Sequence, residues 1–164
     1  MASLTALQQT VQLSDVIAWI ESRGNPHALR FEPLVFSRLT TGAMTPEHAS
    51  IVNRIVRIHN CSIPTAQVIY STSYGLYQLM GFNLYADDSV NSTDLDVVSF
   101  CASSIEQTRV FNTFVSRKLI SYIPAILASH ESSRETFARV YNGDEQAYSA
   151  QIVASLKHFG FQVF

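Results

Sequence analysis

Apolar residues recur at helical spacing along most of the chain, and short polar turns separate the apolar segments. In the first clear segment, Ser14 is a predicted helix cap, and Asp15 complements the dipole of the helix that follows. The apolar face of this helix consists of Val16, Ile17, Trp19 and Ile20. The Gly-Asn-Pro turn at residues 24–26 ends it.

Cap and turn signals divide the rest of the chain into further helices. The clearest start is Thr45, a cap that precedes Pro46 in the first turn and Glu47 at the positive end of the helix dipole. The other predicted helices cover residues 31–39, 65–70, 97–115 (after a capping box at 93–96), 132–141 and 144–158. Because no hairpin signal is strong, the sequence predicts an all-α fold with little or no β-structure.

Length and composition indicate one globular domain. Of the 164 residues, 47% are hydrophobic and 15% are charged, and domains of about 100–200 residues are common. We therefore expect a single domain over residues 1–164, and a monomer. A net charge of -2 and a pI near 6.2 give no polybasic signature, which argues against a nucleic-acid partner.

Several common chemistries lack their sequence signals. None of the five histidines pairs with another at the i, i+3 or i, i+4 spacing of a metal-binding helix. The nucleophile-elbow, dinucleotide and P-loop motifs do not occur, so we expect no metal and no cofactor. Cys61 and Cys101 favour two reduced thiols, although the spacing leaves a single bridge open.

The first residues carry no targeting signal that we recognise. Residues 1–12 lack the positive start and apolar core of a secretory signal. No apolar run approaches the roughly 20 residues of a membrane span. We expect synthesis in the cytoplasm without a signal peptide, and no transmembrane segment.

Glu21 is the candidate catalytic acid, because it directly follows an apolar helix face and precedes a turn. Loss of hydration at such an edge disfavours the anion and raises the pKa of a carboxyl toward the range of a general acid. The alternative is a solvated glutamate in a last helical turn.

A stretch in the middle of the chain has the composition of a sugar-facing wall. Small hydroxylated residues and Gly75 precede a short apolar segment, predicted as a helix, that carries one polar residue. A saccharide site needs an aromatic platform and fixed polar groups. The candidates are Tyr74 and Tyr77 for the platform, and Ser71, Ser73 and Gln78 for the sugar hydroxyl and N-acetyl groups. The alternative is a core helix whose glutamine satisfies a backbone group.

Taken together, these stretches resemble a known family. Glu21-Ser22 with the following turn, and Gly75 to Met80, look like the E-S-x-x-N-P and G-L-M-Q-x-M motifs of goose-type lysozymes and lytic transglycosylases. The ordered motifs at 21–24, 31–40, 74–83 and 137–143 more closely resemble the N-acetylmuramidase domain of phage-type endolysins. The resemblance spans residues 14–160 and implies a lysozyme-like helical fold.

The resemblance also implies roles for individual residues. Glu21 becomes the acid, Gln78 and the hydroxyls of Ser71 and Ser73 become groups of the cleft, and Tyr141-Asn142 becomes its far wall. Tyr77 departs from the wider superfamily, which usually has methionine there. The long insert before Tyr74 is absent from most transglycosylases and favours the muramidase branch.

The function implied is cleavage of the β-1,4 bond between N-acetylmuramic acid and N-acetylglucosamine in peptidoglycan, for phage lysis or host entry. Glu32 is a possible second carboxylate, which would hold a water for hydrolysis. Without one, the chain would be a lytic transglycosylase giving 1,6-anhydromuramic products. The alternatives of another class are a non-catalytic peptidoglycan-binding module and a structural virion domain.

Overall fold

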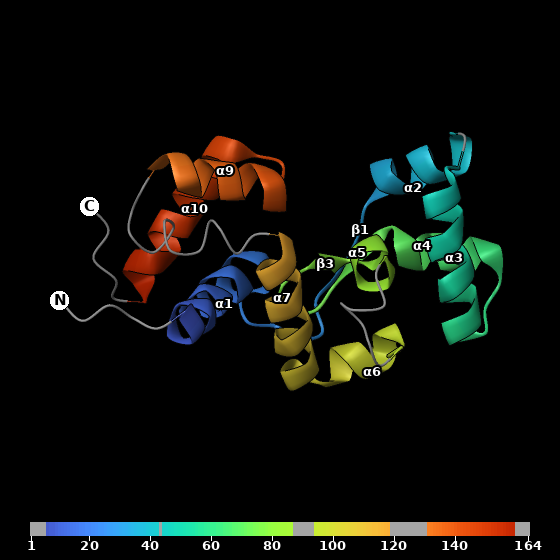
Figure 1. The fold of residues 1–164 in the computed structure, drawn as a ribbon, viewed down its shortest axis with the longest axis horizontal. Helices are drawn as coiled ribbons and strands as arrows, with labels where there is room; N and C mark the ends of the chain where they lie inside the picture. The colour runs from blue at the N-terminus through green and yellow to red at the C-terminus, as the bar shows by residue number, and fades with distance from the viewer. Residues whose placement is uncertain (1–5, 43, 87–93, 119–130, 160–164) are drawn as a thin grey trace. The chain divides into compact units, whose positions relative to one another are not determined.

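A computed structural model describes residues 6–42, 44–86, 94–118 and 131–159 of the chain (Figure 1). This part is mostly helical, which confirms the predicted fold class. Its helices are α1 (Ala6–Ser22), α2 (Pro33–Thr41), α3 (Pro46–His59), α4 (Ile63–Tyr70), α5 (Gly81–Tyr85), α6 (Val97–Ala102), α7 (Ser104–Lys118), α9 (Glu131–Tyr141) and α10 (Glu145–His158). Its strands are β1 (Leu29–Phe31), β2 (Thr72–Tyr74) and β3 (Leu79–Met80).

The chain folds as two compact units. Unit 1 combines Met1–Gly24 with Phe114–Phe164, and unit 2 is the continuous segment Asn25–Thr113. The expectation of a single domain over residues 1–164 stays a prediction. No helix in the described ranges is both long and apolar enough to cross a membrane.

Unit 1 is built around the contact of α1 with α10, which itself packs on α9 (Figure 1). Val16 and Ile17 of α1 and Ile152 of α10 are fully buried, as the apolar period predicts. The predicted cap at Ser14 is wrong, because α1 begins at Ala6 and Ser14 is a buried residue within it. The preceding residues are largely Ala, Leu and Gln, which are good helix formers and do not stop the helix.

Helices α3 and α6 of unit 2 begin at side-chain caps. Thr45 accepts a hydrogen bond from the backbone N–H of His48, which confirms the predicted start of α3. Asp96 caps α6 by accepting from the N–H groups of Val98 and Ser99. The cap of α6 is therefore Asp96, and not Thr93 as in the capping box predicted at 93–96. Thr93 itself lies outside the described residues.

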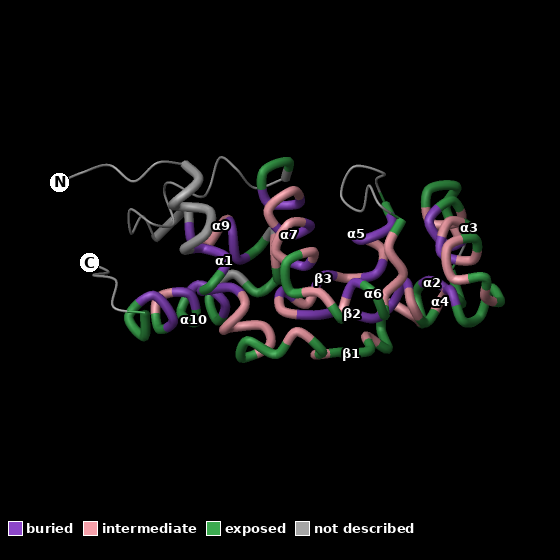
Figure 2. Tube along the Cα trace, turned by 90° about the horizontal axis from the view of Figure 1, so that it is seen from below, coloured by how far each residue is buried: buried purple, intermediate pink, exposed green. Residues whose placement is uncertain are grey.

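The small sheet of unit 2 replaces the short helix predicted near Gly75. Strand β2 lies between β1 and β3 and is antiparallel to both, with Arg30 opposite Ser73. Gly75 and Gln78, in the turn from β2 to β3, have φ of 75° and 46°. An α-helix needs negative φ throughout, so the chain forms a hairpin at this point. Figure 2 shows that β2 is buried whereas β1 is exposed.

Gln107, a fully buried polar residue of α7, connects separate segments of unit 2. Its Oε1 accepts from the Leu76 N–H at 2.7 Å, and its Nε2 donates to the Pro26 carbonyl at 3.0 Å. Nε2 also contacts the carbonyls of Phe100 and Cys101 at 3.1 and 3.2 Å. One side chain thus fixes the hairpin turn, the segment before β1 and the end of α6.

Candidate active site

Glu21 lies in the last turn of α1 and is half-buried. The helix ends directly after it, where the N–H groups of Arg23 and Gly24 donate to the carbonyls of Trp19 and Ala18. Arg23 and Gly24 both have positive φ, of 54° and 76°, which turns the chain away from the helix axis. Glu21 is therefore carried by a rigid helix end, as the sequence predicted.

The Tyr148 hydroxyl donates a hydrogen bond to Oε1 of Glu21 at 2.5 Å. Tyr148 belongs to the first turn of α10, which Asp144 caps by accepting from the Ala147 N–H. The Tyr148 side chain is only 3% exposed. The candidate acid thus has a buried hydroxyl as a partner, supplied from 127 residues further along the chain.

An aromatic cluster supports the ring of Tyr148. Tyr141 stacks on Tyr148 with centroids 5.9 Å apart and on Phe137 with centroids 5.4 Å apart. Phe114 meets Tyr141 edge-on at 6.2 Å. The structure therefore brings Tyr141 into the same cluster as the partner of Glu21, and Asn142 follows it as an exposed residue.

A second ring contact fixes the last turn of α1. Trp19 stacks on His158 of α10 with centroids 4.7 Å apart and planes inclined by 11°. The guanidinium of Arg23 lies over the Trp19 ring, 5.2 Å from its centre. The helix turn that carries Glu21 is thus held by contacts on both sides of that residue.

Ser73 and Gln78 lie together in the hairpin of unit 2. The Ser73 hydroxyl is within 2.9 Å of Gln78 Oε1 and 3.2 Å of the Arg30 carbonyl. The Gln78 Nε2 donates to the carbonyls of Ala28 and Gly75 at 3.1 and 3.0 Å. This amide binds the hairpin turn to the segment before β1, and its role as a sugar contact stays a prediction.

The other hairpin candidates are buried in unit 2. Tyr77 is 3% exposed and stacks on Phe111, with centroids 4.1 Å apart. The Tyr74 hydroxyl donates to the Ile69 carbonyl, and burial raises the pKa of Tyr74 to about 12. Ser71 is fully buried, and its hydroxyl has no hydrogen-bond partner within the described part of the chain. In this arrangement their contacts are internal, and saccharide contacts by these residues stay predictions.

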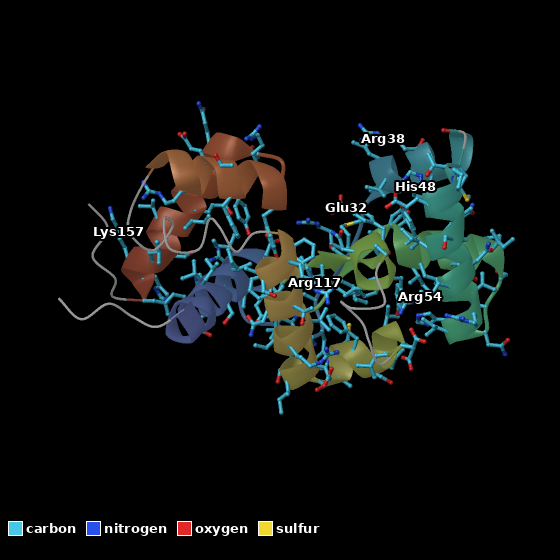
Figure 3. All side chains as sticks on the ribbon, in the orientation of Figure 1. Glu32, Arg38, His48, Arg54, Arg117 and Lys157 are labelled. Atoms are coloured by element: carbon cyan, nitrogen blue, oxygen red, sulfur yellow. The ribbon has the colours of Figure 1, made fainter. Side chains whose placement is uncertain are left out.

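Glu32, the possible second carboxylate, is the residue before α2 in unit 2 (Figure 3). Its Oε1 forms an ion pair with Nε of Arg30 at 2.5 Å, and its side chain is 30% exposed. Glu32 makes no capping hydrogen bond to α2. Within the described ranges, no group of three or more His, Cys, Asp or Glu residues could hold a metal ion.

Sequence reasoning missed two residues that organise these regions. Neither Tyr148 nor Gln107 belongs to one of the motifs found in the sequence. The available signals were a tyrosine in the predicted helix 144–158 and a glutamine in the predicted helix 97–115, but neither signal indicates its partner. Both partners lie far away in sequence, at Glu21 for Tyr148 and at Pro26 for Gln107.

Comparisons with known proteins confirm the resemblance drawn from the motifs. The model of the family described as Muramidase, N-acetylmuramidase, matches residues 10–158. The endolysin of Enterobacteria phage PRD1 is 38% identical over 149 residues, which cover 90% of this chain and 96% of that protein. No solved structure matches the chain. With nearly its whole length matched, the chain belongs to the N-acetylmuramidase family of peptidoglycan-degrading glycosidases.

Proposed function

We propose that Glu21 is the general acid with which this muramidase cleaves the β-1,4 bond between N-acetylmuramic acid and N-acetylglucosamine. The observation that carries the proposal is the half-buried carboxyl at a rigid helix end, with Oε1 held by the Tyr148 hydroxyl. A fixed carboxyl beside apolar residues suits proton donation to a leaving oxygen.

In the proposed reaction, protonated Glu21 gives its proton to the glycosidic oxygen as the bond from that oxygen to the anomeric carbon breaks. Positive charge develops on the muramic acid ring. Water then adds to the anomeric carbon and returns one proton to the Glu21 carboxylate, which restores the acid. If the 6-hydroxyl of the muramic acid adds in place of water, the product is the 1,6-anhydro sugar.

We favour hydrolysis, because the insert and the Phe31-Glu32 motif look like the muramidase branch. The second carboxylate would be Glu32, which would position the attacking water. The biological setting that we propose is lysis of a bacterial host by a phage, since the PRD1 relative is an endolysin. In that setting the enzyme acts on the cell wall after its release, or from the virion.

The test is digestion of purified sacculi by the wild-type enzyme and by Glu21→Gln, with Glu47→Gln as the matched control. Glu47 is an exposed residue in the first turn of α3. Glutamine has the shape of the acid but donates no acidic proton, so we expect Glu21→Gln to lose at least about 100-fold in rate with unchanged circular dichroism. We expect Glu47→Gln to keep the wild-type rate. Near-normal turnover by Glu21→Gln would remove this residue from the acid role.

The same digests identify the reaction by mass spectrometry. Hydrolysis leaves muropeptides that end in muramic acid reducible by borohydride. Transglycosylation leaves products lighter by one water that resist reduction, and such products would overturn the preference for hydrolysis while leaving Glu21 as the acid.

A further inference from the structure

We propose that Tyr148 is a positioning residue that orients the Glu21 carboxyl for proton transfer, and that the rings of α9 hold it in place. The inference rests on the proposed role of Glu21. It goes beyond that role because it assigns a function to a residue outside the motifs at 21–24, 31–40, 74–83 and 137–143.

The contact between Tyr148 and Glu21 has the geometry that this role needs. A hydroxyl at 2.5 Å from Oε1 lies in the short range expected for an O–H donor facing a carboxyl group. Tyr148 is 3% exposed, so little water competes for either partner of this bond. A buried tyrosine needs a partner for its hydroxyl, and the Tyr148 hydroxyl donates to the candidate acid.

Neighbouring groups hold the ring that carries the donor hydroxyl. Tyr148 lies one turn into α10, directly after the capped start at Asp144. Its ring is stacked on Tyr141, which is in turn stacked on Phe137 with planes inclined by only 8°. A hydroxyl on a ring held in this way cannot follow the carboxyl, so the carboxyl adopts the orientation that the hydroxyl fixes.

The Tyr148 hydroxyl can donate to Glu21 in both protonation states of the carboxyl group. An ionised carboxylate accepts a hydrogen bond at either oxygen, and a neutral carboxyl still accepts one at its carbonyl oxygen. Tyr148 can therefore hold Oε1 before and after Glu21 has transferred its proton. It also favours the anion over the acid, since a donor stabilises the charged form more than the neutral one. Removal of the hydroxyl should thus alter both the rate and its dependence on pH.

Other ionisable groups lie on the helices that pack in unit 1, and they contribute to the pH profile of every variant alike. Among the residues whose side chains are described, they are Asp15 of α1, Arg23 after the end of α1, Arg117 of α7, Arg134, Glu135, Arg139 and Tyr141 of α9, and Asp144, Lys157 and His158 of the α10 segment. A comparison of variants that differ in one hydroxyl cancels their common effect.

The experiment compares the pH profile of kcat/KM on solubilised glycan strands for wild type, Tyr148→Phe and Tyr85→Phe. Tyr85 is the matched control, because it is 1% exposed and its hydroxyl donates to the Leu95 carbonyl within unit 2. We expect Tyr148→Phe to lose roughly 10- to 100-fold in rate through misorientation of the acid. We also expect the alkaline limb of its profile to move upward by roughly half a unit to one unit.

The control separates this effect from general destabilisation. Partial unfolding lowers the rate at all pH values by a similar factor, so Tyr85→Phe should keep the wild-type limb. A second variant replaces Tyr148 with 3-fluorotyrosine, which keeps the ring, is a stronger donor and should move the limb to lower pH.

Three outcomes decide the proposal. Opposite movements of the limb in the two Tyr148 variants support it. A limb that stays at the wild-type pH in both variants overturns it, while Glu21 remains the acid if Glu21→Gln is inactive. Normal turnover by Glu21→Gln refutes the proposed function and this inference together.

Discussion

Replacement of Gln107 by leucine tests whether one buried side chain holds unit 2 together. Leucine fills a similar volume but can neither accept from the Leu76 N–H nor donate to the carbonyls of Pro26, Phe100 and Cys101. Because Gln107 is fully buried, water does not readily replace the lost contacts. The substitution should therefore destabilise the fold while the helix itself tolerates leucine well.

The magnitude follows from the contacts. The Gln107 amide nitrogen has two hydrogens for three acceptors, so its four contacts amount to about three independent hydrogen bonds. A net contribution of about 1 kcal/mol for each bond gives a loss of about 3 kcal/mol. Since small domains have a total stability of about 5–15 kcal/mol, such a loss is easily measured.

The assay is urea unfolding followed by far-UV circular dichroism, with Gln151→Leu as the control. Gln151 is exposed on α10, so the same substitution there should change the free energy of unfolding by less than about 0.5 kcal/mol. Equal slopes of free energy against urea are required for the comparison. If Gln107→Leu lost less than about 1 kcal/mol, the side chain would not connect these segments as described.

Two further predictions concern the same unit. Gly75→Ala should lower the free energy of unfolding in urea by at least about 2 kcal/mol, since φ is 75° and a Cβ would lie 2.3 Å from Gln107 Oε1. This loss should be smaller in a Gln107→Ala background, and an equal loss there would refute the clash. Asp96→Ala should lose about 1 kcal/mol of stability at pH 7 with its cap. The pKa of Asp96 is lowered, above all by the hydrogen bond from the Ser99 N–H. The contribution of the Asp96 carboxylate to stability is therefore present above the ordinary pKa of aspartate, and it is lost as the pH falls through the lowered pKa. The gap between wild type and Asp96→Ala in unfolding curves should therefore begin to narrow at about pH 4 and continue to narrow as the pH falls through the lowered pKa, and a gap that stays constant over this range would contradict a capping role for the carboxylate.

Local signals in the sequence were sufficient to predict much of the helical structure. Thr45 followed by Pro46 predicts the start of α3, because a capping hydroxyl and a fixed φ act within a few residues. The same holds for Asp144 at the start of α10. Glu21 was placed correctly at the end of a helix, because the apolar period and the Gly-Asn-Pro turn both lie beside it in sequence.

What the sequence did not predict depends on distant partners. The hairpin at Gly75 has no strong turn signal in the sequence. It forms where β2 pairs with β1, and Ser73 of β2 lies opposite Arg30 of β1, which is more than 40 residues earlier in the chain. The hydroxyl that contacts Glu21 comes from Tyr148, and no local pattern distinguishes this tyrosine from an ordinary core residue. The burial of Ser71 likewise depends on packing around the sheet, which its small polar side chain does not indicate.

The interrupted sequence of unit 1 has a consequence for the order in which the enzyme is made. A ribosome adds about 5–20 residues per second from the N-terminus, so all of Asn25–Thr113 is synthesised before the second part of unit 1. Until α10 emerges, the apolar face of α1 lacks the helix on which it packs, and Glu21 lacks the Tyr148 hydroxyl. A nascent chain therefore contains all of unit 2 before Glu21, the proposed acid, can meet the Tyr148 hydroxyl.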